Sequence, residues 1–140
     1  MSIEMVTLIG ALLFGGVVRN ITGSWWNPSG GVVLFLHDPP TKSLQMRWVF
    51  NSYATGPVTL IGQGTVTALD LRNLELTANI QPISLILDGR LCETSRIDFS
   101  SKARWTQRDV IMKQCSLVFS FHCGKGAPGT ITTDCSGRWE

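Results

Sequence analysis

Four cysteines in the last third of the chain are the residues best placed to do chemistry. A hairpin joining residues 115–122 to 129–135 around a loop at 124–128 would set Cys115 opposite Cys135. That pairing would leave Cys92 with Cys123, and two disulfides would require an oxidising compartment. Four buried free thiols account for the same residues equally well.

A metal site is the less favoured reading of these cysteines. His122, next to Cys123, could complete a Cys₃His set with Cys115 and Cys135. However, the chain lacks the paired C-x-x-C spacing of zinc knuckles. We therefore expect no metal and no cofactor.

Groups suited to catalysis are sparse. His37 and Asp38 are adjacent, and neighbours on a strand point to opposite faces, which disfavours a catalytic triad. The acids between residues 93 and 109 alternate with arginines, a pattern typical of a solvated face. We expect a binding protein and no enzyme.

Five tryptophans against one tyrosine suggest aromatic contacts. Adjacent Trp25 and Trp26 cannot both point into a core, so one must face outward. We expect Trp25 to fill the interior and Trp26 to make protein contacts, because exposed indole is costly unless it is covered.

Charge is low and unevenly distributed. Twelve Lys and Arg against ten Asp and Glu give a net charge of +2, too weak a field to gather nucleic acid. Charges concentrate in residues 88–109, while 5–18 and 20–37 contain no Asp, Glu, Lys or Arg. The first third is therefore expected to be covered on both faces, which favours a homo-oligomer.

The hydrophobic pattern predicts strands throughout. Leu44, Met46, Trp48 and Phe50 alternate with polar or outward residues, and similar runs recur at spacings of 8–12 residues. We predict an all-β fold with residues 20–140 forming a single antiparallel β-barrel of about eight strands, with a sandwich as the alternative. At most one helical turn is expected, near residues 106–112, and a bend is expected at residues 62–64.

Residues 1–19 form an apolar N-terminal segment. Its 14-residue run at 5–18 is too short to cross a bilayer, which takes about 20 residues. It reads as a first strand or as a poor signal sequence. We expect no transmembrane span and a secreted or otherwise extracytoplasmic protein.

The opening motif resembles the first strand of avidin and streptavidin, T-G-x-W-x-N-x-x-G, here Thr22, Gly23, Trp25, Asn27 and Gly30. The resemblance implies an eight-stranded barrel, usually tetrameric, with biotin at its mouth. Asn27 would then hold the ureido oxygen, and Trp105 would wall the ring. Other biotin-contacting positions of that family differ, with Gly31 in place of a serine and Ile80 in place of a tryptophan.

The same segment also resembles the W-W-N-P stretch of bacterial secreted β proteins of unknown function, through Trp25, Trp26, Asn27 and Pro28. This second resemblance implies the same fold class and no particular chemistry.

These observations favour non-enzymatic binding of a small, largely apolar ligand at the open end of a barrel, lined by Asn27, Trp48, Phe50 and Trp105. The alternative is a surface or oligomerisation module that contacts other proteins through exposed tryptophans such as Trp26.

Overall fold

The computed structural model describes residues 20–28, 31–52, 56–106 and 108–140, which contain ten strands and no helix. The apolar segment 1–19 lies outside the described residues. The strands are β1 (Gly23–Asn27), β2 (Gly31–Asp38), β3 (Ser43–Ser52), β4 (Gly56–Ala68), β5 (Asn73–Ile80), β6 (Ser84–Leu87), β7 (Arg90–Trp105), β8 (Val110–Cys123), β9 (Gly129–Asp134) and β10 (Gly137–Trp139). The all-β prediction is confirmed. None of these residues belongs to a helix long and apolar enough to span a membrane.

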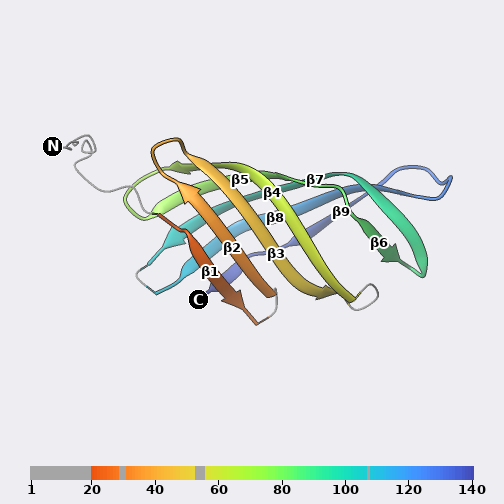
Figure 1. Ribbon diagram of the computed structural model, residues 1–140, viewed down its shortest axis with the longest axis horizontal. Helices are drawn as coiled ribbons and strands as arrows, with labels where there is room; N and C mark the ends of the chain where they lie inside the picture. Colours follow the sequence, from red (N-terminus) through yellow and green to blue (C-terminus); the bar gives the residue numbers. More distant parts are fainter. Residues whose placement is uncertain (1–19, 29–30, 53–55, 107) are drawn as a thin grey trace.

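All strands join one antiparallel sheet, in the order β1-β2-β3-β4-β5-β7-β8-β10, with β6 paired to β7 and β9 paired to β8. Figure 1 shows β1 to β4 crossing in front of β7 and β8. The strands β7 and β8 extend beyond β1 to β4, and in this part β6 pairs with β7 and β9 pairs with β8. No strand ladder joins β10 to β1. Instead, two backbone hydrogen bonds link Trp26 and Glu140, and in one of them the Glu140 N–H donates to the Trp26 carbonyl over 2.8 Å.

One face of the sheet forms the core. Leu44, Met46 and Trp48 are buried, as their alternation predicts, and Leu74 and Leu76 repeat the pattern on β5. Burial of these inward side chains supplies the main driving force for folding, about 1.5–3 kcal/mol for each large apolar residue.

The segment in which at most one helical turn was expected is a tight connection between two strands. The Thr106 N–H donates to the Asp109 carbonyl over 2.9 Å, and β8 begins immediately afterwards at Val110. Residues 110–112 pair with both β7 and β10, so their backbone groups are already used by sheet hydrogen bonds. No helical turn forms at the described residues 106 and 108–112, which is compatible with the expectation of at most one.

β4 continues unbroken through the glycines that were expected to bend it. A Cβ atom on Gly64 would lie 1.8 Å from the carbonyl oxygen of Thr77 on β5. Glycine is therefore required here for the close approach of two backbones, and it does not end the strand.

Two disulfides are present, and their pairing is the one that the hairpin argument predicted. Cys92 on β7 bonds to Cys123, its register partner on β8, and Cys115 on β8 bonds to Cys135, just beyond β9. The chain therefore contains no free cysteine, which excludes the alternative of four thiols. Two disulfides indicate an oxidising environment.

Removing the Cys115–Cys135 bond should destabilise the protein. The bond closes a 20-residue separation, and loss of such a constraint costs about 3 kcal/mol through the unfolded chain. We expect Cys115→Ala/Cys135→Ala to lower the free energy of unfolding by about that amount in urea titrations. A denatured sample of the parent should contain no reactive thiol, and an unchanged urea midpoint in the double variant would contradict the expectation.

Candidate functional site

A cleft of about 620 Å³ is lined mainly by residues of β1, β2, β3, β6, β8, β9 and β10. Leu85, Ile86 and Leu87 of β6 line it on one side, and Ile131, Thr133 and Asp134 of β9 line it on the other. Leu117 and Phe119 reach it from β8. Strands β6, β8 and β9 therefore form one part of the cleft, and residues of β1, β2, β3 and β10 form the rest.

Aromatic rings form the inner end of this cleft. Trp48 of β3 and Trp139 of β10 both line it and pack edge to face with ring centroids 5.1 Å apart. Trp48 also meets Phe99 edge to face at 6.1 Å, which anchors the pair in the core. Trp139 is 1% exposed, and its indole Nε1 is buried with no hydrogen-bond partner among the described residues.

Polar groups lie mainly on the rim. Asp134 is the sole charged side chain among the described residues that line the cleft, and it lies at the exposed end of β9. Hydrogen bonding to Ser136, whose N–H donates to Asp134 Oδ1 over 2.9 Å, lowers the pKa of this carboxyl, and burial opposes the shift weakly. Asp134 is therefore ionised at neutral pH.

Three of the four residues expected to line a ligand site meet in this cleft: Asn27, Trp48 and Phe50. Trp105 does not join them. It lies at the end of the 16-residue strand β7, whereas the wall strand β6 pairs with the opposite end of β7 at residues 90–93. Trp105 is half-buried and packs against the core.

The adjacent tryptophans separate as expected. Trp25 is half-buried against the core, and its indole Nε1 donates to the Ile21 carbonyl over 2.9 Å. Trp26 is 62% exposed and lies at the rim of the cleft.

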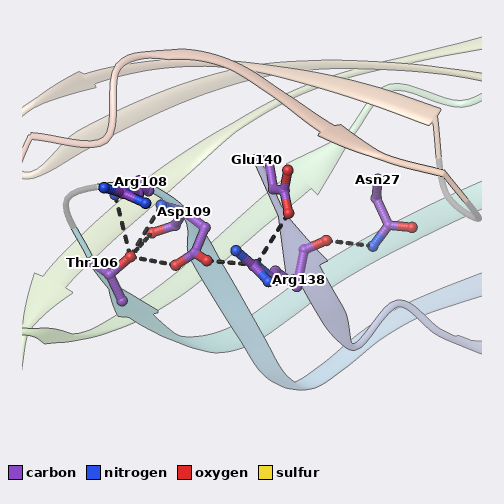
Figure 2. Close-up of polar contacts among 6 residues, drawn as sticks. All are labelled: Asn27, Thr106, Arg108, Asp109, Arg138 and Glu140. Carbon is purple, nitrogen blue, oxygen red and sulfur yellow. Dashed lines mark hydrogen bonds and ion pairs between the residues drawn. The ribbon is translucent and has the colours of Figure 1, made fainter.

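A chain of polar contacts fixes β10, and with it Trp139, beside the cleft. Figure 2 shows Asp109 between Thr106 and Arg138. The Thr106 hydroxyl donates to Asp109 Oδ1, and Arg138 Nε donates to Asp109 Oδ2 over 2.6 Å. On the far side, Asn27 Nδ2 donates to the Arg138 carbonyl over 3.0 Å. Asn27 therefore holds β1 to β10 in addition to lining the cleft.

These contacts also set the protonation of Asp109. The hydrogen bond from Thr106 lowers the pKa of this carboxyl, with a further contribution from Arg138, while burial acts in the opposite direction. The carboxylate is therefore the form that the folded protein prefers.

His37 lies outside the cleft lining and has a structural role. It is 4% exposed, and its Nδ1 accepts a hydrogen bond from the Ile21 N–H over 3.2 Å. Burial lowers the pKa of the imidazole, and the neighbouring Asp38 partly offsets that effect. His37 is thus a neutral ring that holds residue 21 against β2.

The described residues contain no group of three or more His, Cys, Asp or Glu side chains arranged to hold a metal ion. His122 is exposed on β8, and its neighbour Cys123 is bonded to Cys92.

Several cleft residues were not identified from the sequence: Leu85, Leu87, Leu117, Phe119, Asp134 and Trp139. A usable signal existed for Leu117 and Phe119, which alternate with Phe121 on one face of a strand. Trp139 had no such signal. Its position depends on the short strand β10, which pairs with residues 110–112 of β8 after the chain leaves β9 and passes residues 135–136.

Comparison of the chain with protein-family models, with curated proteins and with solved structures gave no match.

Loss of the Asp109 carboxylate should destabilise the protein in a pH-dependent way. The folded-state pKa lies below the ordinary value of 3.8, so the ionised carboxylate stabilises the fold above that pH and the benefit disappears as pH falls through the folded-state pKa. Asp109→Asn should therefore lower the free energy of unfolding at pH 7, and the difference from the parent should shrink progressively as pH falls below the ordinary value of 3.8.

Urea titrations between pH 3 and pH 8 measure this difference. Asp98→Asn is the matched control, because Asp98 forms an exposed ion pair with Arg96, and such pairs contribute little. A gap between parent and Asp109→Asn that stays constant down to pH 3 would show that the carboxylate charge is not what stabilises the connection.

Proposed function

We propose that this chain binds a small, largely apolar ligand in the cleft, without catalysis. The observation that carries the proposal is the cleft itself, whose volume of about 620 Å³ falls within the range of small-molecule sites. Aromatic and aliphatic side chains dominate its lining, and a few polar groups lie at the rim, as in typical ligand pockets.

The composition of the lining supports binding over catalysis. Among the described residues that line the cleft, Asp134 is the sole titrating side chain, because Cys135 is bonded to Cys115. Asp134 has the Ser136 hydroxyl beside it, but no imidazole or amine among the described lining residues completes the nucleophile, base and orienting group that acyl transfer and related reactions need.

We further propose that the sheet closes into a barrel between β10 and β1. The Trp26–Glu140 backbone hydrogen bonds and the Asn27–Arg138 contact support closure at this point. The cleft would then be the open end of the barrel. The likeness to avidin remains a prediction from the opening motif, so biotin belongs among the ligands tested.

Secretion is part of the same proposal. The two disulfides support folding in an oxidising compartment, and a protein that binds apolar ligands outside the cytoplasm meets that condition.

Ligand binding should change the emission of the cleft tryptophans. We expect N-phenyl-1-naphthylamine, a neutral apolar dye, to bind with enhanced fluorescence and to quench intrinsic tryptophan emission. Phe50→Ala removes a ring that lines the cleft and should weaken dye binding by about 1 kcal/mol, or about fivefold.

Phe121→Ala is the matched control, because Phe121 is also half-buried but does not line the cleft. Biotin and a panel of apolar ligands are then tested by displacement of the dye. If the dye and the whole panel leave the emission unchanged, the proposal fails.

A second candidate function is self-association through the outward face of β1 to β4. We define the outer patch as the exposed side chains Trp26, Leu34, Leu36, Val49 and Ile61. Strand pairing brings these side chains close together. Arg47 of β3 pairs with Leu34 of β2 on one side and with Ile61 of β4 on the other. Val32 of β2 likewise pairs with Trp26 of β1 and with Val49 of β3. Exposed apolar side chains grouped in this way mark interaction surfaces, and here the group includes the charged Arg47 between Leu34 and Ile61.

Sedimentation velocity tests this candidate. We expect the parent to sediment as an oligomer and Leu34→Ser/Ile61→Ser to shift it towards monomer, because each serine removes apolar area from the outer patch. Leu69→Ser/Leu91→Ser is the control, since both leucines are exposed outside the patch. A parent that stays monomeric at high concentration would rule out self-association.

A further inference from the structure

His37 contacts the residues that lead into β1, at the end of that strand away from the cleft. We propose that His37 is an acid-sensitive latch, in which protonation of the imidazole releases residues 20–22 from β2. This inference stands apart from ligand binding, because neither His37 nor any of residues 20–25 lines the cleft.

Three hydrogen bonds hold residues 21 and 22 against His37. The Ile21 N–H donates to His37 Nδ1 over 3.2 Å. The Thr22 hydroxyl donates to the His37 carbonyl over 3.0 Å and accepts from the His37 N–H over 2.8 Å. Ring protonation directly alters the bond to Nδ1, so the charge of the imidazole controls the latch.

The closed latch requires a neutral imidazole. Nδ1 can accept from the Ile21 N–H only while it carries no proton, so the single ring proton is on Nε2. Protonation would place an N–H on Nδ1, facing the Ile21 N–H, and that backbone donor would lose its acceptor. The ring is 4% exposed and Nε2 has no partner among the described residues, so the imidazolium would be shielded from water with no acceptor for either N–H.

The charged groups around His37 do not overturn this preference. Asp38, the next residue on β2, raises the pKa of the imidazole, but burial lowers that pKa by more. Residues 20–27, and residues 43–46 around the register partner Leu44, contain no titratable side chain. Lys42, in the turn between β2 and β3, is exposed. The closed latch therefore stabilises the fold fully above the ordinary histidine pKa of 6.5, and its contribution decreases as pH falls below that value.

Release would open the core locally while the sheet stays paired. Ile21 is 0% exposed and belongs to the core, so its side chain would lose its contacts when the latch opens. The Ile21 carbonyl also accepts from Trp25 Nε1 over 2.9 Å, and that indole N–H would then meet water. β1 keeps its pairing with β2 along residues 23–27. The expected change is therefore confined to one end of β1.

Hydrogen exchange measured by NMR tests the latch in the parent protein. We expect the protection factors of the Ile21 amide and the Trp25 indole N–H to fall about tenfold between about pH 7.5 and about pH 4.5. Each factor is corrected for the intrinsic exchange rate, which itself varies with pH. The amide of Leu76, on β5 between β4 and β7, should keep its protection over the same range.

The imidazole provides a second readout that needs no variant. The midpoint of the loss of protection at Ile21 should coincide with the titration of the His37 ring resonances, because one proton causes both changes. A midpoint that does not follow the His37 resonances would contradict the latch.

His37→Asn assigns the effect to the ring. The asparagine oxygen can accept from the Ile21 N–H but does not titrate, so protection at Ile21 should no longer depend on pH. His122→Asn is the matched control, because His122 is exposed on β8 and should leave the pH dependence of the parent unchanged.

The other outcomes overturn the proposal. If protection at Ile21 does not change on acidification, or if it falls as much in His37→Asn as in the parent, His37 is not a latch. An equal loss of protection at Leu76 would mean that acid unfolds the whole sheet, and this result would also exclude a local release of residues 20–22.

Discussion

The pairing of β7 with β8 is the constraint on which the rest of the sheet depends. These are the two longest strands, and each changes its outer neighbour partway along: β7 pairs first with β6 and then with β5, and β8 pairs first with β10 and then with β9. The strands β1 to β4 join this hairpin only through its near half. The far half of the hairpin therefore has only β6 and β9 beside it, and residues of β6, β8 and β9 line the cleft.

Much of the fold follows from local pattern. The alternation from Leu44 to Trp48 predicted the buried face of β3. The dipeptide Asp88–Gly89 is typical of a tight turn, and the structure has one there, with positive φ at both residues. The hairpin spacing predicted both disulfides. These features depend on residues that are close in sequence or on a single strand pair, so one sequence contains enough information to find them.

What the sequence did not reveal depends on irregular or distant pairing. The full lengths of β7 and β8 do not show in the sequence pattern, because register shifts near Ser95 and Ser101 interrupt the period-two alternation while the ladder continues. Trp139 enters the cleft because β10 is held in place by Asp109 and Asn27, from segments far apart in the chain. Trp105 was placed by analogy with another family, and the length of β7 carries it to the other end of the sheet.

The strands β6 and β9, which form the walls of the cleft, are held less firmly than the β7–β8 ladder between them. β6 and β9 each pair with only one strand of the described sheet, whereas the floor between them is a long ladder crossed by the Cys92–Cys123 bond. Moving β6 outward breaks one short ladder, whereas the Cys115–Cys135 bond ties the end of β9 to β8, so β6 is the compliant wall. If the cleft binds a ligand as we propose, one compliant wall would let it accept related molecules that differ in width.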